Sequence, residues 1–575
     1  MNQDLIDKLK QNFKGEISID PGTLEHFSRD SSIFEMMPQL VVFPKDINDL
    51  KALVKFVNEN KKDNPHLSLT ARAAGTCMSG GTLNNSIIVS LTEHINKLVE
   101  LKVRDQEVIV EPGLFYRDFE KELDQHDLLL PPYTSSKRLN TVGGMVANNS
   151  GGEKSLGYGK TEKYVEKLKV ILSDGEEYEI KKMTKDELVK RIECDDTLSK
   201  IYKKVFDILD KNRDLIAKHK PRVTKNSAGY TIWDVLSGEA GSRTNVNSSG
   251  DETYFDAPKL FVGSQGTLGI ITEITFSLIK KKKHQGILMI FMQNYDNLPQ
   301  IVNTVMKHKP DCFESFDHYT FELALKYVEG FGKILKLSKD EVIKAFHPEF
   351  ARVEKNGIPE LTLLVEYEDD DLHTIHENLN KLNAELSGFD NLETYMTHNA
   401  DERAKYWAIR RESFGLLKSQ VKGKYAAPFI DDIVVETDKL PEFFPKLYKL
   451  LNESKLMYTV AGHIGNGNFH IIPLMEMEDP EAAKKIYHMM DRVFDLVWEY
   501  HGSDSGEHND GLVRAPYLMH QFGEGVYKIF KEIKDAFDPD DIFNPKKKVN
   551  VTKQYAEKFL IKDSTPLKGQ ITFTR

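Results

Sequence analysis

The sequence predicts an α+β protein built from two principal domains, and three observations lead to this prediction. In the first half of the chain, short apolar strands are separated by loops rich in glycine, asparagine and serine. In the second half, apolar strands alternate with amphipathic helices, an order that favours an antiparallel sheet. Four consecutive lysines at residues 280–283 lie between the halves and are typical of a solvated linker, so we place the domain boundary there.

The first 36 residues are expected to form a helical segment. Leu5, Leu9 and Phe13 recur at intervals of four, as on one face of a helix. This pattern favours a helix docked on the protein, and a helix lying on a membrane surface is the alternative.

The first domain is expected to cover residues 37–280. A strand in PQLVVFP leads into a helix in DINDLKALVKFVNEN, and Asp174 and Gly175 suit the tight turn of a hairpin. Residues 237–257 are polar and aperiodic, so they predict a long surface insertion. Further strands are expected in LSLTAR, IIVSL, VIVEPG and residues 260–279, and further helices at residues 114–128 and about 185–218.

The second domain is expected to cover residues 281–550, followed by a tail at residues 551–575. Its apolar strands are GILMIFM and ELTLLVEY, and its helices include LPQIVNTVMK and DLHTIHENLNKLNAEL. This alternation predicts an α+β domain with an antiparallel sheet.

Composition and charge exclude several classes of protein. The chain has 575 residues with 78 Lys and Arg against 89 Asp and Glu, and the net charge of −11 argues against nucleic-acid binding. No apolar run reaches the roughly 18 residues of a transmembrane helix, and the opening residues do not form a signal peptide. Cys77, Cys194 and Cys312 form no CxxC, which excludes a disulfide framework and a cysteine-ligated iron–sulfur cluster. We therefore expect a cytoplasmic protein, with peripheral contact to the inner membrane face as a further option.

Two glycine-rich segments predict a site for a dinucleotide. They are RAAGTCMSGG at residues 72–81 and TVGGMVANNSGG at residues 141–152, and GSQGTLG at residues 263–269 adds a third. Glycine permits positive φ and close approach of the backbone, so successive N–H groups can converge on a pyrophosphate. The chain contains no GxGxxG, and KSLGYGKT has Lys154 where a phosphate loop requires glycine. A Rossmann nicotinamide site and an ATPase are therefore not supported.

A second constellation consists of histidines and a carboxylate. His463 and His470 flank GNGN, a strong turn signal that folds the chain back and can bring both imidazoles together. Glu507 and His508 follow in the segment SGEH. Two histidines and a carboxylate can form an open site for Zn²⁺ or Mn²⁺, with coordination positions left for a substrate. The alternative is that these histidines are structural.

Over residues 38–545, these segments and their order resemble the FAD-linked D-2-hydroxyacid dehydrogenases. This family has the FAD-binding domain of the vanillyl-alcohol oxidase/p-cresol methylhydroxylase class, so the resemblance implies a two-lobed FAD-binding domain and a substrate-binding cap domain. The family's RGGGTG is RAAGTC here, and Thr76 stands where related covalent flavoproteins have a linking histidine, which favours non-covalent FAD. A thioether to Cys77 is the alternative. By resemblance, the FAD-binding residues are Arg72, Gly75, Thr76, Cys77, Met78, Ser79, Gly80, Gly81, Thr141, Gly143, Gly144, Asn148, Ser150, Gly151, Gly152, Gly266, Gly269, Ile271 and Asn544.

The resemblance also assigns roles in the second constellation. It implies that His463, His470 and Glu507 ligate the metal and that His508 and Asn468 face the substrate. His508 is followed by Asn509 rather than the family's usual glycine. In the segment YWAIRRE, Arg410 matches the family's WxxRE arginine, which binds the substrate carboxylate, and Arg411 is the second choice.

The expected reaction is the oxidation of a D-2-hydroxy acid. Arg410 would clamp the carboxylate, His508 would accept the hydroxyl proton, and hydride would pass to flavin N5 with assistance from the metal. Relatives selective for a dicarboxylate have polar residues near Ile430 and Ile472, so the two isoleucines favour D-lactate. Alternatives are a D-2-hydroxyglutarate or glycolate dehydrogenase, or the flavin subunit of a larger electron-transfer complex. The electron acceptor stays open between oxygen, a quinone, an electron-transferring flavoprotein and a partner subunit, and a homodimer is possible.

Overall fold

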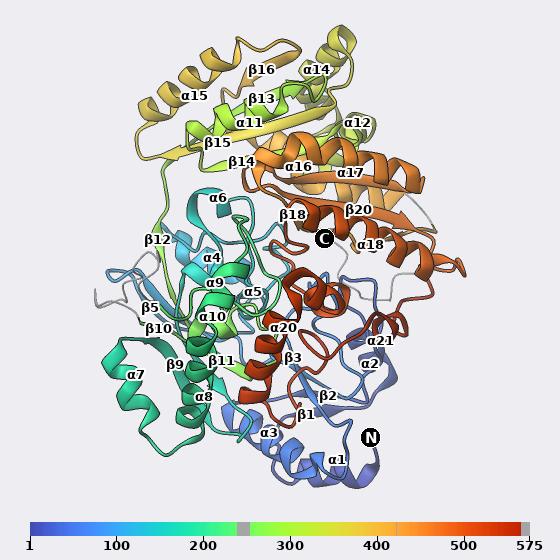
Figure 1. The fold of residues 1–575 in the computed structure, drawn as a ribbon. Helices are drawn as coiled ribbons and strands as arrows, with labels where there is room; N and C mark the ends of the chain where they lie inside the picture. Colours follow the sequence, from blue (N-terminus) through green and yellow to red (C-terminus); the bar gives the residue numbers. More distant parts are fainter. Residues whose placement is uncertain (238–253, 421–422, 565–575) are drawn as a thin grey trace.

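A computed structural model describes residues 1–237, 254–420 and 423–564 (Figure 1). Most of the surface insertion expected at residues 237–257 and the last part of the tail lie outside the described residues.

A four-stranded sheet forms the N-terminal lobe. Its order is β1–β2–β4–β3, with β2 and β3 parallel to β4, and α3 provides the crossover after β2. The expected docked helix is present, because α1 turns the side chains of Ile6 and Leu9 into the core of this lobe. The elements are α1 (Gln3–Lys10), β1 (Glu16–Ser18), α2 (Pro21–Phe27), β2 (Leu40–Phe43), α3 (Ile47–Lys61), β3 (Leu69–Arg72) and β4 (Ile87–Ser90).

A six-stranded antiparallel sheet forms the second lobe, in the order β10–β9–β8–β11–β6–β5. The predicted hairpin is confirmed, since Gly175 adopts φ 76° between β8 and β9. Its strands are β5 (Leu98–Lys102), β6 (Glu107–Val110), β8 (Val165–Ile171), β9 (Glu177–Met183), β10 (Phe255–Asp256) and β11 (Ile270–Ser277). Its helices are α4 (Tyr116–Asp124), α5 (Val142–Asn148), α6 (Ser155–Tyr158), α7 (Lys185–Ile192), α8 (Thr197–Lys211), α9 (Arg213–His219) and α10 (Pro258–Phe261).

The prediction of a strand over residues 260–279 is wrong for the first part of this range. Pro258 begins the short helix α10, and Gly263 and Gly266 then adopt φ 85° and 69°. Positive φ is incompatible with a strand, so β11 begins only at Ile270. Just after β11 ends, the chain forms the short strand β12 (Ile279–Lys280), which pairs with β7 (Leu128–Leu129).

The second half of the chain, called the cap below, contains the antiparallel sheet that the sequence predicts, and this sheet has eight strands. Its path is β16–β13–β15–β14–β19–β20–β17, and β18 pairs with β20. The strands are β13 (His284–Met292), β14 (Cys312–Asp317), β15 (Leu361–Asp369), β16 (Leu392–Met396), β17 (Tyr425–Ala426), β18 (Ile433–Val434), β19 (Met457–His463) and β20 (Asn468–Met475). The helices are α11 (Leu298–Lys307), α12 (His318–Lys326), α13 (Val328–Leu335), α14 (Lys339–Asn356), α15 (Leu372–Leu386), α16 (Ala400–Gln420), α17 (Leu440–Ser454) and α18 (Ala482–Glu499).

After the cap, the chain returns to the N-terminal half. Helix α20 (Leu518–Phe537) packs against α8, and both lie in the lower part of Figure 1. Phe543 then forms a parallel bridge with Leu69 of β3. The short helices α19 (Gly511–Arg514) and α21 (Lys553–Glu557) flank this segment. The division at residue 280 stays a prediction.

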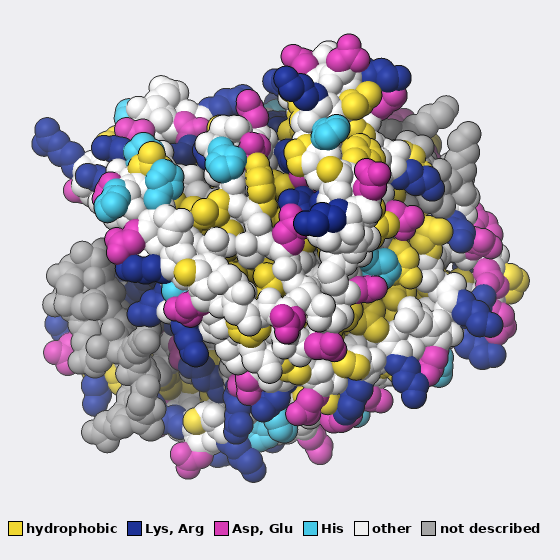
Figure 2. Space-filling model, turned by 90° about the horizontal axis from the view of Figure 1, so that it is seen from above, with side chains coloured by type: hydrophobic (Ala, Val, Ile, Leu, Met, Phe, Trp, Pro, Cys, Tyr) yellow, Lys and Arg dark blue, Asp and Glu magenta, His cyan; other side chains and the backbone are white. Residues whose placement is uncertain are grey.

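Two features of the structure bear on the predictions made from composition: the distribution of charged side chains on the surface, and the length and apolar character of the helices. In the view from above, Lys and Arg side chains are interspersed with Asp and Glu over most of the face, and several of them lie together at the lower left (Figure 2). None of the helices in the described part of the chain has the length and apolar character that a membrane span requires.

Candidate active site

One cavity of about 890 Å³ joins the glycine-rich loops to the histidines of the cap. Its volume lies in the range of about 300–1,000 Å³ that is typical of sites for small molecules and cofactors. Lining residues come from β3 and its following loop, from α5, from β11 and from the cap strands β19 and β20. Elements far apart in the sequence therefore share one site.

Most of the residues expected to bind FAD line this cavity. Arg72, Ser79, Gly80 and Asn544 do not. Arg72 donates to the carbonyl oxygens of Phe27 and Arg29, and Asn544 donates to those of Gly81 and Gln265. The lining members of the expected set are Gly75, Thr76, Cys77, Met78, Gly81, Thr141, Gly143, Gly144, Asn148, Ser150, Gly151, Gly152, Gly266, Gly269 and Ile271.

Glycine at position 151 lets the flavin loop approach the cap. A Cβ atom on Gly151 would lie 2.8 Å from Oε2 of Glu507 and 2.8 Å from the Ser155 hydroxyl, both closer than a side chain tolerates. The absence of a side chain here places an expected metal ligand against the loop expected to hold the flavin. This contact connects the two halves of the site.

The predicted turn brings His463 and His470 together. His463 ends β19 and His470 lies in β20, and the connecting Gly467 adopts φ 66° in the tight hairpin. The ring centroids lie 5.2 Å apart. Both Nε2 atoms approach Oε1 of Glu507, at 3.2 Å from His463 and 3.4 Å from His470.

These separations fit a tetrahedral metal ion. With metal–ligand bonds of about 2.0–2.1 Å, two ligand atoms of a tetrahedral zinc site lie about 3.3 Å apart. The Nδ1 atoms of the same histidines contact buried carboxylates, Glu314 at 2.6 Å from His463 and Asp431 at 3.1 Å from His470. Carboxylates in this position orient metal-binding imidazoles. His463, His470 and Glu507 could therefore hold a divalent cation.

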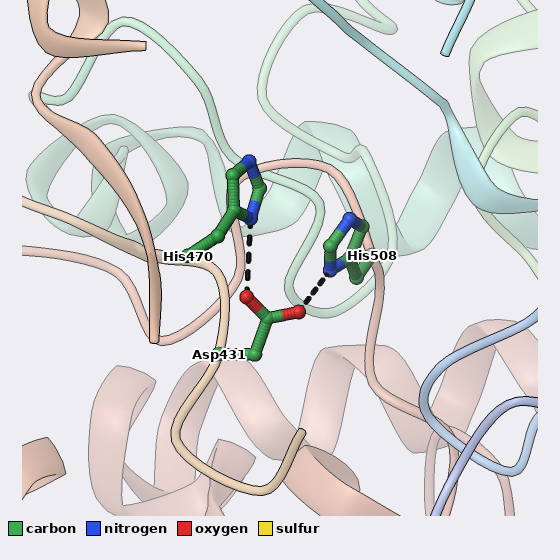
Figure 3. A group of neighbouring side chains, drawn as sticks. All are labelled: Asp431, His470 and His508. Carbon is green, nitrogen blue, oxygen red and sulfur yellow. Dashed lines mark hydrogen bonds and ion pairs between the residues drawn. The ribbon is translucent and has the colours of Figure 1, made fainter. Parts of the chain in front are cut away.

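His508 lies beside the three expected metal ligands and lines the cavity. Its ring stacks on His470 with centroids 4.9 Å apart, and its Nδ1 lies 2.6 Å from Oδ2 of Asp431 (Figure 3). The backbone N–H groups of Glu507 and His508 donate to the buried carboxylate of Asp432 at 2.9 and 2.7 Å. Two adjacent aspartates therefore hold the SGEH segment, one through its backbone and one through an imidazole.

Both candidate arginines line the cavity, and each has a carboxylate partner. Arg410 donates from Nε and Nη2 to Oε2 of Glu314, at 2.9 and 2.8 Å, and its Nη1 has no partner among the described residues. Arg411 pairs with Glu153 and stacks on Trp407. Glu314 thus contacts both Arg410 and His463.

Asn468 is fully buried and does not line the cavity. Its Nδ2 donates to Asp432 at 3.0 Å, and its Oδ1 accepts from Lys225 at 3.4 Å. Lys225 also donates to Oε2 of Glu507 at 2.9 Å. The structure therefore places Asn468 behind the site, where it supports the carboxylates rather than facing the cavity.

The buried carboxylates raise the proton affinity of His470. Burial disfavours the charged imidazole, but the charge of Asp431 and hydrogen bonds to Asp431 and Glu507 outweigh it and raise the pKa of His470 to about 10. Burial also opposes ionisation of Glu507, yet Lys225 and His463 hold its pKa well below its usual range. The same negative potential that recruits a proton to His470 also attracts a cation, and the two compete for Nε2.

Four important residues were not identified from the sequence: Glu314, Asp431, Asp432 and Lys225. The adjacent acids in the apolar stretch PFIDDIVV were a usable signal, because buried carboxylates need a partner. Glu314 and Lys225 lie in ordinary surroundings in the sequence, and no local pattern distinguishes them.

Comparison with known families identifies the chain. Residues 38–181 match the family described as "FAD binding domain", and residues 281–548 match "FAD linked oxidases, C-terminal domain". The chain belongs to the FAD-linked oxidases. The matched FAD-binding domain supports FAD as the cofactor of this chain.

Curated relatives of this FAD-linked oxidase cover nearly the whole chain. It is 25% identical to a D-2-hydroxyglutarate dehydrogenase of Haemophilus influenzae, over 95% of this chain and 51% of the relative. It is 26% identical to a D-lactate dehydrogenase of Anaerostipes hadrus, over 95% of this chain and 97% of the relative. The chain thus spans about half the length of several D-2-hydroxyglutarate dehydrogenases that it matches.

Solved structures confirm the predicted fold class. The structure of p-cresol methylhydroxylase superposes on the FAD-linked oxidase with a TM-score of 0.64 at 14% identity, covering 95% of this chain and 97% of the other. The fold is that of the vanillyl-alcohol oxidase/p-cresol methylhydroxylase class.

Proposed function

We propose that this FAD-linked oxidase oxidises a D-2-hydroxy acid to the 2-oxo acid, with non-covalent FAD and a divalent cation, Zn²⁺ or Mn²⁺, at His463, His470 and Glu507. The observation that supports this most directly is the single cavity that joins the glycine-rich loops to the histidine–carboxylate cluster and to Arg410. Hydride transfer requires the substrate carbon to lie close to the flavin, so the reaction needs a shared cavity.

Separate residues bind the substrate carboxylate and accept the hydroxyl proton. Arg410, held by Glu314, presents Nη1 to the substrate carboxylate. His508, held through Nδ1 by Asp431, leaves Nε2 to accept the hydroxyl proton. When bound, the divalent cation would lower the pKa of the hydroxyl, and FAD would supply the hydride acceptor.

D-lactate is the proposed substrate. Ile472 lines the cavity, while Ile430 is fully buried and does not reach it. Neither position offers a partner to a second carboxylate, and burial of an unpaired charge is costly.

D-2-hydroxyglutarate is the second candidate, and a specific observation favours it. Lys333 on α13 and Lys336 at its C-terminal end also line the cavity, so they offer positive charge near the substrate side. The curated relatives include several named D-2-hydroxyglutarate dehydrogenase.

Anaerobic reduction of the flavin by a panel of substrates tests both candidates. We expect kcat/KM for D-lactate to exceed that for D-2-hydroxyglutarate at least tenfold, about 1.4 kcal/mol, and L-lactate to be inactive. A preference for D-2-hydroxyglutarate that disappears in Lys333→Ala would replace the first candidate by the second. Failure of every 2-hydroxy acid to reduce the flavin would contradict the proposed function and leave the chain as a flavin subunit without a substrate site of this kind.

A further inference from the structure

One buried carboxylate, Asp431, contacts two imidazoles that come from different parts of the chain (Figure 3). Its Oδ1 lies 3.1 Å from Nδ1 of His470 on β20, and its Oδ2 lies 2.6 Å from Nδ1 of His508. The aspartate itself is 0% exposed. Both oxygens are therefore occupied by histidines with different expected tasks.

A second cation between these three residues does not fit the distances. Ligand atoms around one tetrahedral zinc ion lie about 3.3 Å apart. The contact of 2.6 Å between Asp431 and His508 is that of a charge-assisted hydrogen bond and leaves no room for a metal. The Asp431 carboxylate therefore accepts a hydrogen bond from the Nδ1–H group of each histidine.

The surroundings hold Asp431 in this position. Arg514, which is fully buried, donates from Nη2 to the Asp431 carbonyl oxygen at 2.5 Å. The neighbouring Asp432 adopts φ 70° and accepts the backbone N–H of His508 at 2.7 Å, which brings the imidazole of His508 against Asp431. The backbone is therefore arranged so that adjacent aspartates point to different parts of the same segment.

We propose that Asp431 is a positioning residue that sets the tautomer and the orientation of both His470 and His508. A neutral imidazole has one N–H, and a carboxylate at Nδ1 holds that proton there, so Nε2 keeps its lone pair. In His470 this lone pair is directed to the cation site, and in His508 it is directed to the hydroxyl of the substrate. The proposal rests on the proposed function: the effect on His470 requires only its cation site, whereas the effect on His508 requires the oxidation of the substrate.

Glu314 offers a matched control on the opposite side of the site. It accepts a hydrogen bond from Nδ1 of His463 at 2.6 Å, as Asp431 does from His470. Its other oxygen pairs with Arg410, whereas the other oxygen of Asp431 contacts the proposed base His508. Removal of either carboxylate releases one metal-ligating imidazole. Only the removal of Asp431 also releases His508.

The experiment compares Asp431→Asn with Glu314→Gln in the FAD-loaded protein. Competition with a chelator measures Zn²⁺ affinity, and we expect it to fall about 10- to 100-fold in both variants. With Zn²⁺ at saturation, Glu314→Gln should regain most of its kcat with D-lactate and keep a raised KM, because Arg410 loses its support. Asp431→Asn should stay at least about 100-fold below wild type in kcat, because an amide favours the wrong tautomer of His508.

A double-mutant comparison shows whether Asp431 acts through His508. In a His508→Ala background, adding Asp431→Asn should lower kcat little further, since the group that it positions is gone. If Asp431→Asn does not retain FAD, Asp431→Glu, which keeps the carboxylate, takes its place. The Zn²⁺ affinity of Asp431→Glu should be closer to that of the wild type than the Zn²⁺ affinity of Glu314→Gln.

Two results would overturn the proposal. Wild-type kcat in Zn²⁺-saturated Asp431→Asn would remove the role at His508, and unchanged Zn²⁺ affinity would remove the role at His470. The Zn²⁺ measurement needs no substrate, so a chain that oxidises no 2-hydroxy acid contradicts the proposed function without deciding this point.

Discussion

At the scale of single residues, buried carboxylates decide what each functional side chain can do. Glu314 holds Arg410 and His463, while Lys225 neutralises one oxygen of Glu507 and leaves the other near both imidazoles. Such pairs are costly to break, because a buried charge without a partner loses its hydration and gains nothing in return. The site is therefore sensitive to residues that never contact a substrate.

Metal removal is expected to abolish activity while FAD stays bound. The proposed metal ligands His463 and His470 lie on the cap hairpin, whereas most of the residues expected to bind FAD lie on loops of the first half. Dialysis against a chelator should remove one divalent cation per chain, measured by elemental analysis, and leave the flavin absorbance unchanged. Full activity of the demetallated protein would contradict the metal's role.

A surface histidine supplies the control for the same measurement. His94 lies 3.3 Å from Glu16 in a partly exposed pair outside the site. We expect His463→Ala and His470→Ala to lose the cation and His94→Ala to retain it. Equal metal content in all three variants would place the cation elsewhere.

At the scale of elements, a buried ionic network joins the flavin side to the cap. Lys154, at the start of α6, pairs with Glu366 and with Glu368 of β15, the latter at 2.7 Å. Glu366 also accepts from the indole of Trp407 on α16. The lysine that breaks the phosphate-loop pattern in KSLGYGKT is therefore the residue that fastens α6 to the cap sheet.

Lys154→Ala should destabilise the protein strongly. It leaves Glu366 and Glu368, both nearly fully buried, without their cation, a change that costs about 3–5 kcal/mol. Lys167→Ala is the matched control, because its pair with Glu179 spans 3.5 Å with both side chains well exposed, and such pairs contribute less than about 1 kcal/mol. Thermal melts should separate the two variants clearly. Similar melting temperatures would show that the network does not hold the cap in place.

At the scale of the whole molecule, two lobes and a cap enclose one cavity. The chain returns from the cap to the N-terminal half through α20 and the bridge between Leu69 and Phe543. This return fastens the C-terminal segment to the strand that leads into the first glycine-rich loop. The cavity thus depends on contacts between parts of the chain that are hundreds of residues apart.

FAD is expected to leave the protein on denaturation. Thr76 and Cys77 both line the cavity, and a hydroxyl at position 76 offers no covalent link of the kind that a histidine makes. Precipitation with acid should release the yellow colour into the supernatant. Colour that remains in the pellet of the wild type and is released from Cys77→Ser would instead demonstrate a thioether to Cys77.

Local patterns determined much of this protein from the sequence alone. Apolar periodicity predicted α3 and α15, because burial on one face of a helix repeats every three to four residues. Continuous apolar runs predicted the central cap strands β13 and β15, which are buried along most of their length. The GNGN turn predicted that His463 and His470 meet, because glycine and asparagine tolerate the conformation that a tight hairpin needs. The roles assigned to the site residues stay predictions.

Only the tertiary structure decided which partners complete the site. Glu314 is 149 residues from His463, and Lys225 is 282 residues from Glu507. Contacts at such separations arise when sheets and loops pack together, and no period or motif in the chain encodes them. The exclusion of Asn468 from the cavity has the same origin, since Asp432 and Lys225 bind its amide only in the folded protein. Local signals determine the elements and the turns, whereas packing determines how buried charges are neutralised.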